Sequence, residues 1–264
     1  MIDSHCHLDM IPSWGNKEIS WEEKKREIEE ILEKAALAGI DKVLNPGVAW
    51  EDMENLLDLG KSFPRVFLAV GIHPHEAKTW EEGSIEKLKE FAKDPKVRAI
   101  GEIGLDYHYD LSPREAMQRA FSEQIELAIF LKLPLIVHSR EAHEDTLRIL
   151  QSSHAEEIGG IMHCFSGSLD LARAAMKLNF DISFSGSLTF ANATRLREIA
   201  KNIPLEKTLI ETDAPYMAPV PFRGKRCEPA YVVKVAEKLA EIHSVPLEEV
   251  IEKTTRNAER IFRI

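Results

Sequence analysis

The chain has 264 residues, of which 44% are hydrophobic, and a formal net charge of −10 at pH 7. This length suffices for a sizeable core and is close to the roughly 250 residues typical of a (β/α)8 barrel. The sequence has neither an apolar run of about 18 residues nor a charged-then-apolar leader with a cleavage site. We therefore expect an unexported, cytoplasmic protein with no membrane segment. The negative charge also excludes a basic surface that holds nucleic acid non-specifically.

The three cysteines, Cys6, Cys164 and Cys227, are an odd number with no paired spacing. This argues against a disulfide framework and for a reducing compartment. Cys6 and Cys164 each adjoin a candidate metal ligand in an expected strand, so strand alternation should direct their thiols away from a metal.

Short apolar runs alternate with segments of helical period along the whole chain, which predicts parallel strands joined by crossover helices. The expected strands cover residues 2–8, 40–47, 66–72, 97–105, 133–138, 158–164, 180–185 and 207–212. Eight such strands predict an α/β fold, a (β/α)8 TIM barrel, as a single domain over residues 1–264.

The expected helices carry local start and stop signals. Between the first two strands, Gly39 is placed to end a helix in a left-handed conformation. The apolar stripe of that helix comprises Ile28, Ile31, Leu32 and Ala35.

Proline marks the start of three later helices. Ser112 is expected to cap a helix that begins at Pro113, with Glu115 completing a capping box. Two last helices, starting from Pro229 and from Pro246, are expected to complete the outer ring.

Ligand-type side chains lie within or directly after five of the expected strands. They are His5, His7, Glu102, His138, His163 and Asp213. Because the carboxyl ends of parallel barrel strands open on one face, these side chains should converge there. A single His-x-His pair is also compatible with ordinary polar strand residues, but the whole set predicts one metal centre.

Six segments containing these residues resemble the TatD-related family of metal-dependent deoxyribonucleases and hydrolases, within the amidohydrolase-like barrel group. The segments are DSHCHLD at 3–9, GIHPH at 71–75, GEIGLDY at 101–107, VHSREA at 137–142, HCFSG at 163–167 and ETDAPY at 211–216. The resemblance covers essentially the entire chain.

The resemblance implies a barrel that holds two divalent metal ions. His5, His7 and Asp213 would bind the first ion. His138 and His163 would bind the second, and Glu102 would bridge the two. Mixed histidine and carboxylate ligands are compatible with zinc, manganese or magnesium.

The same resemblance implies a hydrolase whose substrate is left open, since family members include nucleases acting on DNA and relatives are linked to removal of D-amino acids from transfer RNA. The segment PFRGKRCEP at 221–229 is similar to the family's substrate-side loop. Many members have Asn where this chain has Cys227.

Residue chemistry suggests further roles in the site. Asp213 is expected to ligate an ion and to take a proton from the attacking water, and Glu102 is expected to act in catalysis as the bridging ligand. Arg223 is a candidate phosphate clamp because its planar fork can hold two oxygens. His73 could orient a substrate phosphate or support a ligand, whereas His75 is expected to lie in a loop. Tyr216 could line the pocket or stack on a base.

These features lead to three hypotheses about function. The first is a metal-dependent phosphodiesterase that cuts DNA, or another phosphodiester substrate, from an end. The alternative is an ester or amide hydrolase such as a D-aminoacyl-tRNA deacylase, because a metal-activated water attacks carbon as well as phosphorus. A non-catalytic metal-binding protein is the third, although it has no need for an open substrate face. The sequence indicates no membrane partner and no obligate protein partner.

Overall fold

The structure, a computed structural model, describes residues 1–15 and 18–264 of the chain. Its centre is one parallel sheet of eight strands whose neighbours follow the order of the chain. The strands are β1 (Ile2–Asp3), β2 (Lys42–Pro46), β3 (Val66–Val70), β4 (Val97–Asp106), β5 (Leu135–Arg140), β6 (Gly160–Met162), β7 (Phe180–Phe184) and β8 (Thr208–Ile210). The sheet curves until the amide of Ser4 donates to the carbonyl oxygen of Ile210 at 3.2 Å, which nearly closes the barrel.

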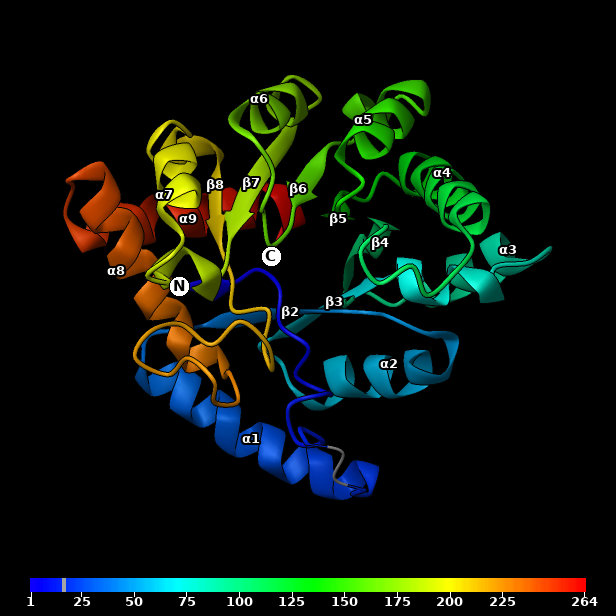
Figure 1. Ribbon diagram of the computed structural model, residues 1–264. Helices are drawn as coiled ribbons and strands as arrows, with labels where there is room; N and C mark the ends of the chain where they lie inside the picture. The colour runs from blue at the N-terminus through cyan, green and yellow to red at the C-terminus, as the bar shows by residue number, and fades with distance from the viewer. Residues whose placement is uncertain (16–17) are drawn as a thin grey trace.

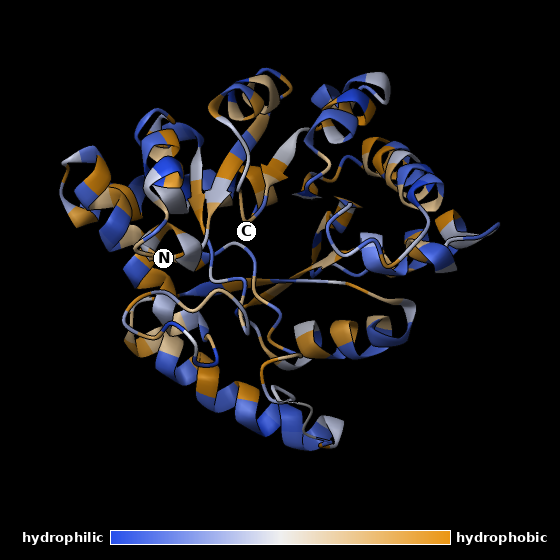
Figure 2. Ribbon diagram, viewed as in Figure 1, coloured by the Kyte–Doolittle hydropathy of each residue, from blue (hydrophilic) through white to orange (hydrophobic). Residues whose placement is uncertain are grey.

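The first eight helices surround the strands in chain order, and the ninth lies behind the strands in the view of Figure 1. They are α1 (Trp21–Leu37), α2 (Met53–Ser62), α3 (Ser84–Phe91), α4 (Arg114–Leu131), α5 (His143–Ser152), α6 (Leu169–Lys177), α7 (Thr194–Lys201), α8 (Val232–His243) and α9 (Leu247–Phe262). Figure 2 shows hydrophobic residues interspersed with hydrophilic ones along the outer helices, as expected for helices that bury one face against a sheet. The predicted (β/α)8 barrel is therefore confirmed.

The first strand is shorter than the expected residues 2–8, because the regular ladder ends at Asp3. Beyond it the chain is held by single hydrogen bonds to both of its neighbours. The amide of Cys6 donates to the carbonyl oxygen of Leu44 at 3.0 Å, and the amide of His7 donates to that of Ala214 at 2.8 Å. The segment stays fixed in the barrel without the pairing that defines a strand.

Helix α1 has the predicted features. Its buried residues include the whole expected stripe of Ile28, Ile31, Leu32 and Ala35. Gly39 follows the helix with φ of +84°, a conformation that glycine adopts without a clash from Cβ.

The predicted capping box of α4 is wrong. The helix begins after Pro113, and no side chain caps it. The hydroxyl of Ser112 instead donates to the carbonyl oxygen of His75 at 2.8 Å and accepts from the amide of Lys78 at 3.1 Å. A tertiary contact with the short helix at Pro74–Thr79 thus replaces the local cap.

Helices α8 and α9 occur where Pro229 and Pro246 predicted them, but α9 does more than complete the outer ring. Ala258 and Phe262, near its end, pack into a buried cluster with residues of the strands. The strand members of this cluster are Ile2, Leu44, Ala69, Ala99, Ile136, Ile161 and Leu209. Ile264 packs against the same cluster, and in the view of Figure 1 the C-terminus is seen within the outline of the ring of strands. Helix α9 therefore covers the amino end of the barrel, opposite to the end where active sites of this fold form.

Within the part of the chain that the structure describes, no helix combines the length and apolarity needed to span a bilayer.

Candidate metal centre

The structure brings all six predicted ligand residues to one pocket at the carboxyl ends of the strands. Glu102 and His138 belong to β4 and β5, and the others lie in the segments that follow β1, β6 or β8. Five of the six line a pocket of about 580 Å³, a volume within the range of ligand-binding sites. His5 lies beneath it, fully buried. The predicted convergence is thus observed.

One carboxylate oxygen of Glu102 faces the two N-terminal histidines. Its Oε2 lies 3.1 Å from Nε2 of His5 and 3.5 Å from Nε2 of His7. The two Nε2 atoms are 3.2 Å apart, and each lies 3.8 Å from Oδ1 of Asp213. These four atoms, two imidazole nitrogens and two carboxylate oxygens, therefore lie around one candidate position for an ion.

The other oxygen of Glu102 faces a second group of nitrogens, which adjoins the first where the rings of His5 and His163 stack with centroids 3.9 Å apart. Its Oε1 lies 2.8 Å from Nδ1 of His138, 2.8 Å from Nε2 of His163 and 3.3 Å from Nε2 of His73. His73 thus joins a group that the sequence analysis limited to His138 and His163. Its ring also lines the pocket, where it can meet a substrate.

The spacing of these atoms fits a divalent cation. Ligands about 2.0 to 2.1 Å from a tetrahedral ion lie roughly 3.3 to 3.4 Å from one another. The four atoms of the first group are separated by 3.1 to 3.8 Å where their distances are measured. The Nδ1 atoms of His5 and His7 are buried without a hydrogen-bond partner among the described residues, so these rings make their polar contacts on the cluster side.

The protonation of His7 and His73 suits a cation directly, whereas an ion must displace a proton from His138 and His163. Burial lowers the pKa of His7 to about 3 and that of His73 to about 4, so both rings are neutral and offer lone pairs. Burial also lowers the pKa of the other two rings, but the carboxylates beside them outweigh it and raise both values, Asp106 and Glu102 for His138 and Glu102 and Glu211 for His163.

Burial opposes ionisation of Glu102, but the surrounding histidines, His163 first, hold its pKa well below the usual range. Burial raises the pKa of Asp213 to about 6, against the influence of His163.

Backbone geometry positions the carboxylate of Asp213. Its φ is +56°, a left-handed conformation in which aspartate is among the less strained non-glycine residues. Its amide donates to the carbonyl oxygen of His5 at 2.9 Å, which ties the end of β8 to the residue it faces in the cluster.

Two carboxylates that the sequence analysis assigned no role hold the histidines in place. Glu211 accepts from the amide of Cys164 at 2.6 Å, and its Oε1 lies 3.2 Å from Nδ1 of His163. Asp106 Oδ2 lies 3.2 Å from Nε2 of His138. A carboxylate behind a histidine fixes the ring orientation of a metal ligand. Glu211 lies two residues before Asp213 in the sequence, and this spacing is a signal by which Glu211 could have been predicted as part of the site.

His75 also differs from its expected place. It lies in the short helix Pro74–Thr79 and lines the pocket. Its Nε2 is 2.9 Å from Oδ2 of Asp106. The carboxylate therefore links His75 to His138.

The residues predicted to contact substrate fall in different places. Tyr216 is 48% exposed and lines the pocket, where its ring meets that of Trp14 edge to face. Arg223 is not among the pocket-lining residues, and its guanidinium lies over the ring of Phe190, 4.3 Å from the centroid. Cys227 is buried, and its amide donates to the carbonyl oxygen of Pro215 at 3.0 Å.

The cysteines are all free. Cys6 is fully buried in the core, as alternation predicted. Cys164 instead lines the pocket, because β6 ends at Met162 and Cys164 has φ of +42°, which interrupts the alternation. Its Sγ contacts the hydroxyl of Ser185 at 3.2 Å, and burial holds its pKa well above the usual range. Cys164 therefore remains a neutral thiol.

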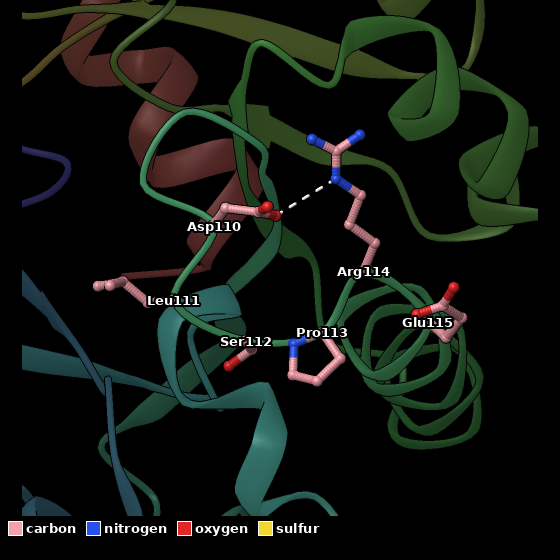
Figure 3. A pocket seen from close by; sticks show the side chains of 6 residues that line it. All are labelled: Asp110, Leu111, Ser112, Pro113, Arg114 and Glu115. Carbon is pink, nitrogen blue, oxygen red and sulfur yellow. Dashed lines mark hydrogen bonds and ion pairs between the residues drawn. The ribbon is translucent and has the colours of Figure 1, made fainter.

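A second hollow lies in the loop before α4, lined by Asp110, Leu111, Ser112, Pro113, Arg114 and Glu115 (Figure 3). None of these side chains belongs to a group of potential metal ligands among the described residues. The candidate site is thus the pocket around Glu102.

Comparison with known proteins identifies the family. The profile of the family described as "TatD related DNase" matches residues 2–263. The chain belongs to the TatD-related DNase family. Membership confirms the predicted metal-dependent hydrolase of ester bonds.

Individual relatives match over nearly their whole length. The metal-dependent hydrolase YabD of Bacillus subtilis is 40% identical over 264 residues, covering 100% of this chain and 99% of the relative. The 3'-5' ssDNA/RNA exonuclease TatD of Salmonella typhimurium is 32% identical over 241 residues, covering 89% and 93%. The crystal structure of YjjV, a TatD homologue from Escherichia coli K12, has a TM-score of 0.90 at 31% identity, covering 100% and 98%.

Replacing Glu211 with glutamine should weaken metal binding by about 10- to 100-fold, as expected when a carboxylate behind a ligand is lost. The neutral amide no longer raises the basicity of the His163 ring as the carboxylate does, and it orients the ring less firmly toward the ion. Affinity should be measured by competition with a chelator, with exposed Glu54→Gln as the control. Equal affinities for the two variants would show that Glu211 does not position His163.

Proposed function

We propose that this protein is a nuclease that removes nucleotides from an end of a nucleic acid, using two divalent ions held around Glu102. The observation that carries this proposal is the placement of the two oxygens of Glu102 against two adjoining groups of nitrogens. A carboxylate in this position can serve two ions at once. His5, His7 and Asp213 would hold one ion, and His73, His138 and His163 the other.

When bound, two such ions would supply an activated water and positive charge for a phosphoryl oxygen. Asp213 can take the proton of that water, since its carboxylate lines the pocket beside the position of the first ion. Asp106 and Glu211 keep His138 and His163 oriented during the reaction. Zinc, manganese and magnesium all suit the mixed ligand set.

The charge of the pocket supports a role for cations in binding a phosphodiester. Its lining includes Glu102, Asp106 and Asp213, whereas Arg140 is the only lysine or arginine there among the described residues. A phosphodiester therefore enters a site whose own charges repel it. Two divalent cations reverse this balance.

Action from an end is supported by the pocket and by one relative. A pocket of about 580 Å³ is of a size that admits a small ligand. It can therefore take a terminal nucleotide, whereas a duplex is far larger. The relative from Salmonella typhimurium is a 3'-5' exonuclease. We also propose a reducing, cytoplasmic location, which the three free cysteines support.

The proposal is tested with protein reconstituted separately with zinc, manganese or magnesium. Single- and double-stranded DNA labelled at either end should release mononucleotides from one end. Internal fragments would contradict action from an end, and intact DNA with every metal would contradict a nuclease. An aminoacyl ester of transfer RNA, assayed in parallel, tests the alternative hydrolase.

A further inference from the structure

The pocket contains an arginine to which neither the sequence analysis nor the proposed reaction gives a role. Arg140 is the last residue of β5, two positions after His138. Residues two apart in a strand point to the same side, and both side chains line the pocket. Arg140 therefore places a permanent positive charge beside the candidate metal centre.

The charge of Arg140 has no acidic partner among the described residues, and the reason lies in the strand beside it. Arg140 is in register with Asp106 on β4. Both oxygens of Asp106 are already engaged. Oδ1 accepts from the amides of His108 and Tyr109 at 2.9 Å each. Oδ2 contacts ring nitrogens of His75 and His138 at 2.9 and 3.2 Å. The carboxylate of Asp106 is thus fully occupied by other donors, and the guanidinium of Arg140 can bind an anion.

An aromatic ring supports the guanidinium of Arg140 in this position. The central carbon lies over the ring of Tyr109, 4.7 Å from its centroid. A guanidinium stacked on a ring keeps its five N–H groups free for an anion. Tyr109 itself is 53% exposed and lines the pocket.

Arg114 provides a contrast nearby. Its guanidinium also lies over a tyrosine, Tyr107, at 4.2 Å. However, its Nε is 3.3 Å from Oδ1 of Asp110, the pair drawn in Figure 3, and it is outside the main pocket. Both arginines stack on a tyrosine, but Arg114 is paired with an acid and lies outside the main pocket, whereas Arg140 lines that pocket.

We propose that Arg140 binds the phosphate adjacent to the scissile one and that Tyr109 is its positioning residue; this rests on the proposed nuclease function. Two residues of a strand span about 6.6 Å. This distance between His138 and Arg140 along β5 is comparable to the separation of neighbouring phosphates in one strand. When the terminal phosphodiester lies at the metal centre, the next phosphate can therefore reach Arg140.

The experiment combines Arg140→Gln with a substrate that lacks the adjacent charge. A short single-stranded DNA oligonucleotide carries an uncharged methylphosphonate at the second linkage from the end that is digested. Removing a charge-assisted contact should lower kcat/KM by about 10- to 100-fold. We expect this loss for the wild type on the modified DNA and for Arg140→Gln on normal DNA. The variant should lose little more on the modified DNA, because the same contact is already absent.

Three controls separate this role from a structural one. Arg114→Gln should behave as the wild type on both DNAs. Bis(p-nitrophenyl) phosphate has no adjacent phosphate, so the wild type and Arg140→Gln should hydrolyse it at equal rates. Tyr109→Phe, which keeps the ring, should retain the preference for the charged linkage, whereas Tyr109→Ala should lose it.

The outcomes distinguish the inference from the function on which it rests. Additive losses for the variant and the methylphosphonate would overturn the role of Arg140. An equal loss on bis(p-nitrophenyl) phosphate would overturn it too, as would identical behaviour of Arg140→Gln and Arg114→Gln. If the wild type releases no nucleotide from any DNA, the proposed function itself fails.

Discussion

Replacing Glu102 with glutamine should abolish hydrolysis, lowering kcat/KM by more than about 100-fold, since changes behind a ligand alone can cost that much. Glutamine has nearly the same shape but carries no charge, and an NH₂ group replaces one oxygen. One of the two groups of histidine nitrogens would then face a donor instead of an acceptor. Both candidate ion positions depend on this side chain, so both should be impaired.

The assay should be paired with measurement of bound metal per chain and with circular dichroism. We expect Glu102→Gln to keep its secondary structure while binding less metal, and exposed Glu126→Gln to match the wild type. Full activity of Glu102→Gln would refute the bridging role. If Glu102→Gln binds the full amount of metal but is inactive, Glu102 acts in the chemical step and is not needed to hold the ions.

The positions of the candidate ligands could be predicted because they depend mainly on strand order. An apolar run that ends in His138 or His163 indicates both a parallel strand and its open end. The same pattern points to Glu102 and Asp213, although Glu102 lies within β4 and the carboxylate of Asp213 is positioned by the left-handed backbone after β8. The conformation at Asp213 could not be predicted from strand order.

Contacts made by loops could not be predicted in this way. Arg223 was expected to act as the phosphate clamp because of its charge, but the fold stacks it on Phe190 outside the pocket. Arg140 lies in the pocket because it follows His138 by two residues on β5, and it lacks an acidic partner there because Asp106, its neighbour in register, already makes other contacts. The contacts that occupy Asp106 come from backbone amides and from His75, and these groups are distant from Arg140 in the sequence.

Tertiary competition also explains the errors in local structure. The sequence around Ser112 satisfies the rule for a capping box, yet the hydroxyl bonds to His75 and Lys78 instead. Helix α9 has an ordinary amphipathic pattern, which does not reveal whether its apolar face covers the side or the end of a barrel. Both outcomes are decided by segments far away in the chain.

Replacing Phe262 with alanine should lower the free energy of unfolding by about 3 to 5 kcal/mol, the usual cost of truncating a fully buried phenylalanine. Phe262 is 1% exposed and belongs to the cluster formed by α9 and the strands. Its removal leaves a cavity at the amino end of the barrel. Strands on several sides of that cavity are held by their own hydrogen bonds and can collapse into it only partly.

Urea unfolding of metal-free protein should show this loss as a lower midpoint with little change in slope. Leu37→Ala is the matched control, because Leu37 is 90% exposed and should change stability by less than about 0.5 kcal/mol. The metal centre lies at the opposite end of the barrel, so the folded fraction of Phe262→Ala should keep its metal affinity. A loss of stability below about 1 kcal/mol would contradict the packing of α9 against the barrel interior. A loss of metal affinity would show instead that the two ends of the barrel are coupled through the strands.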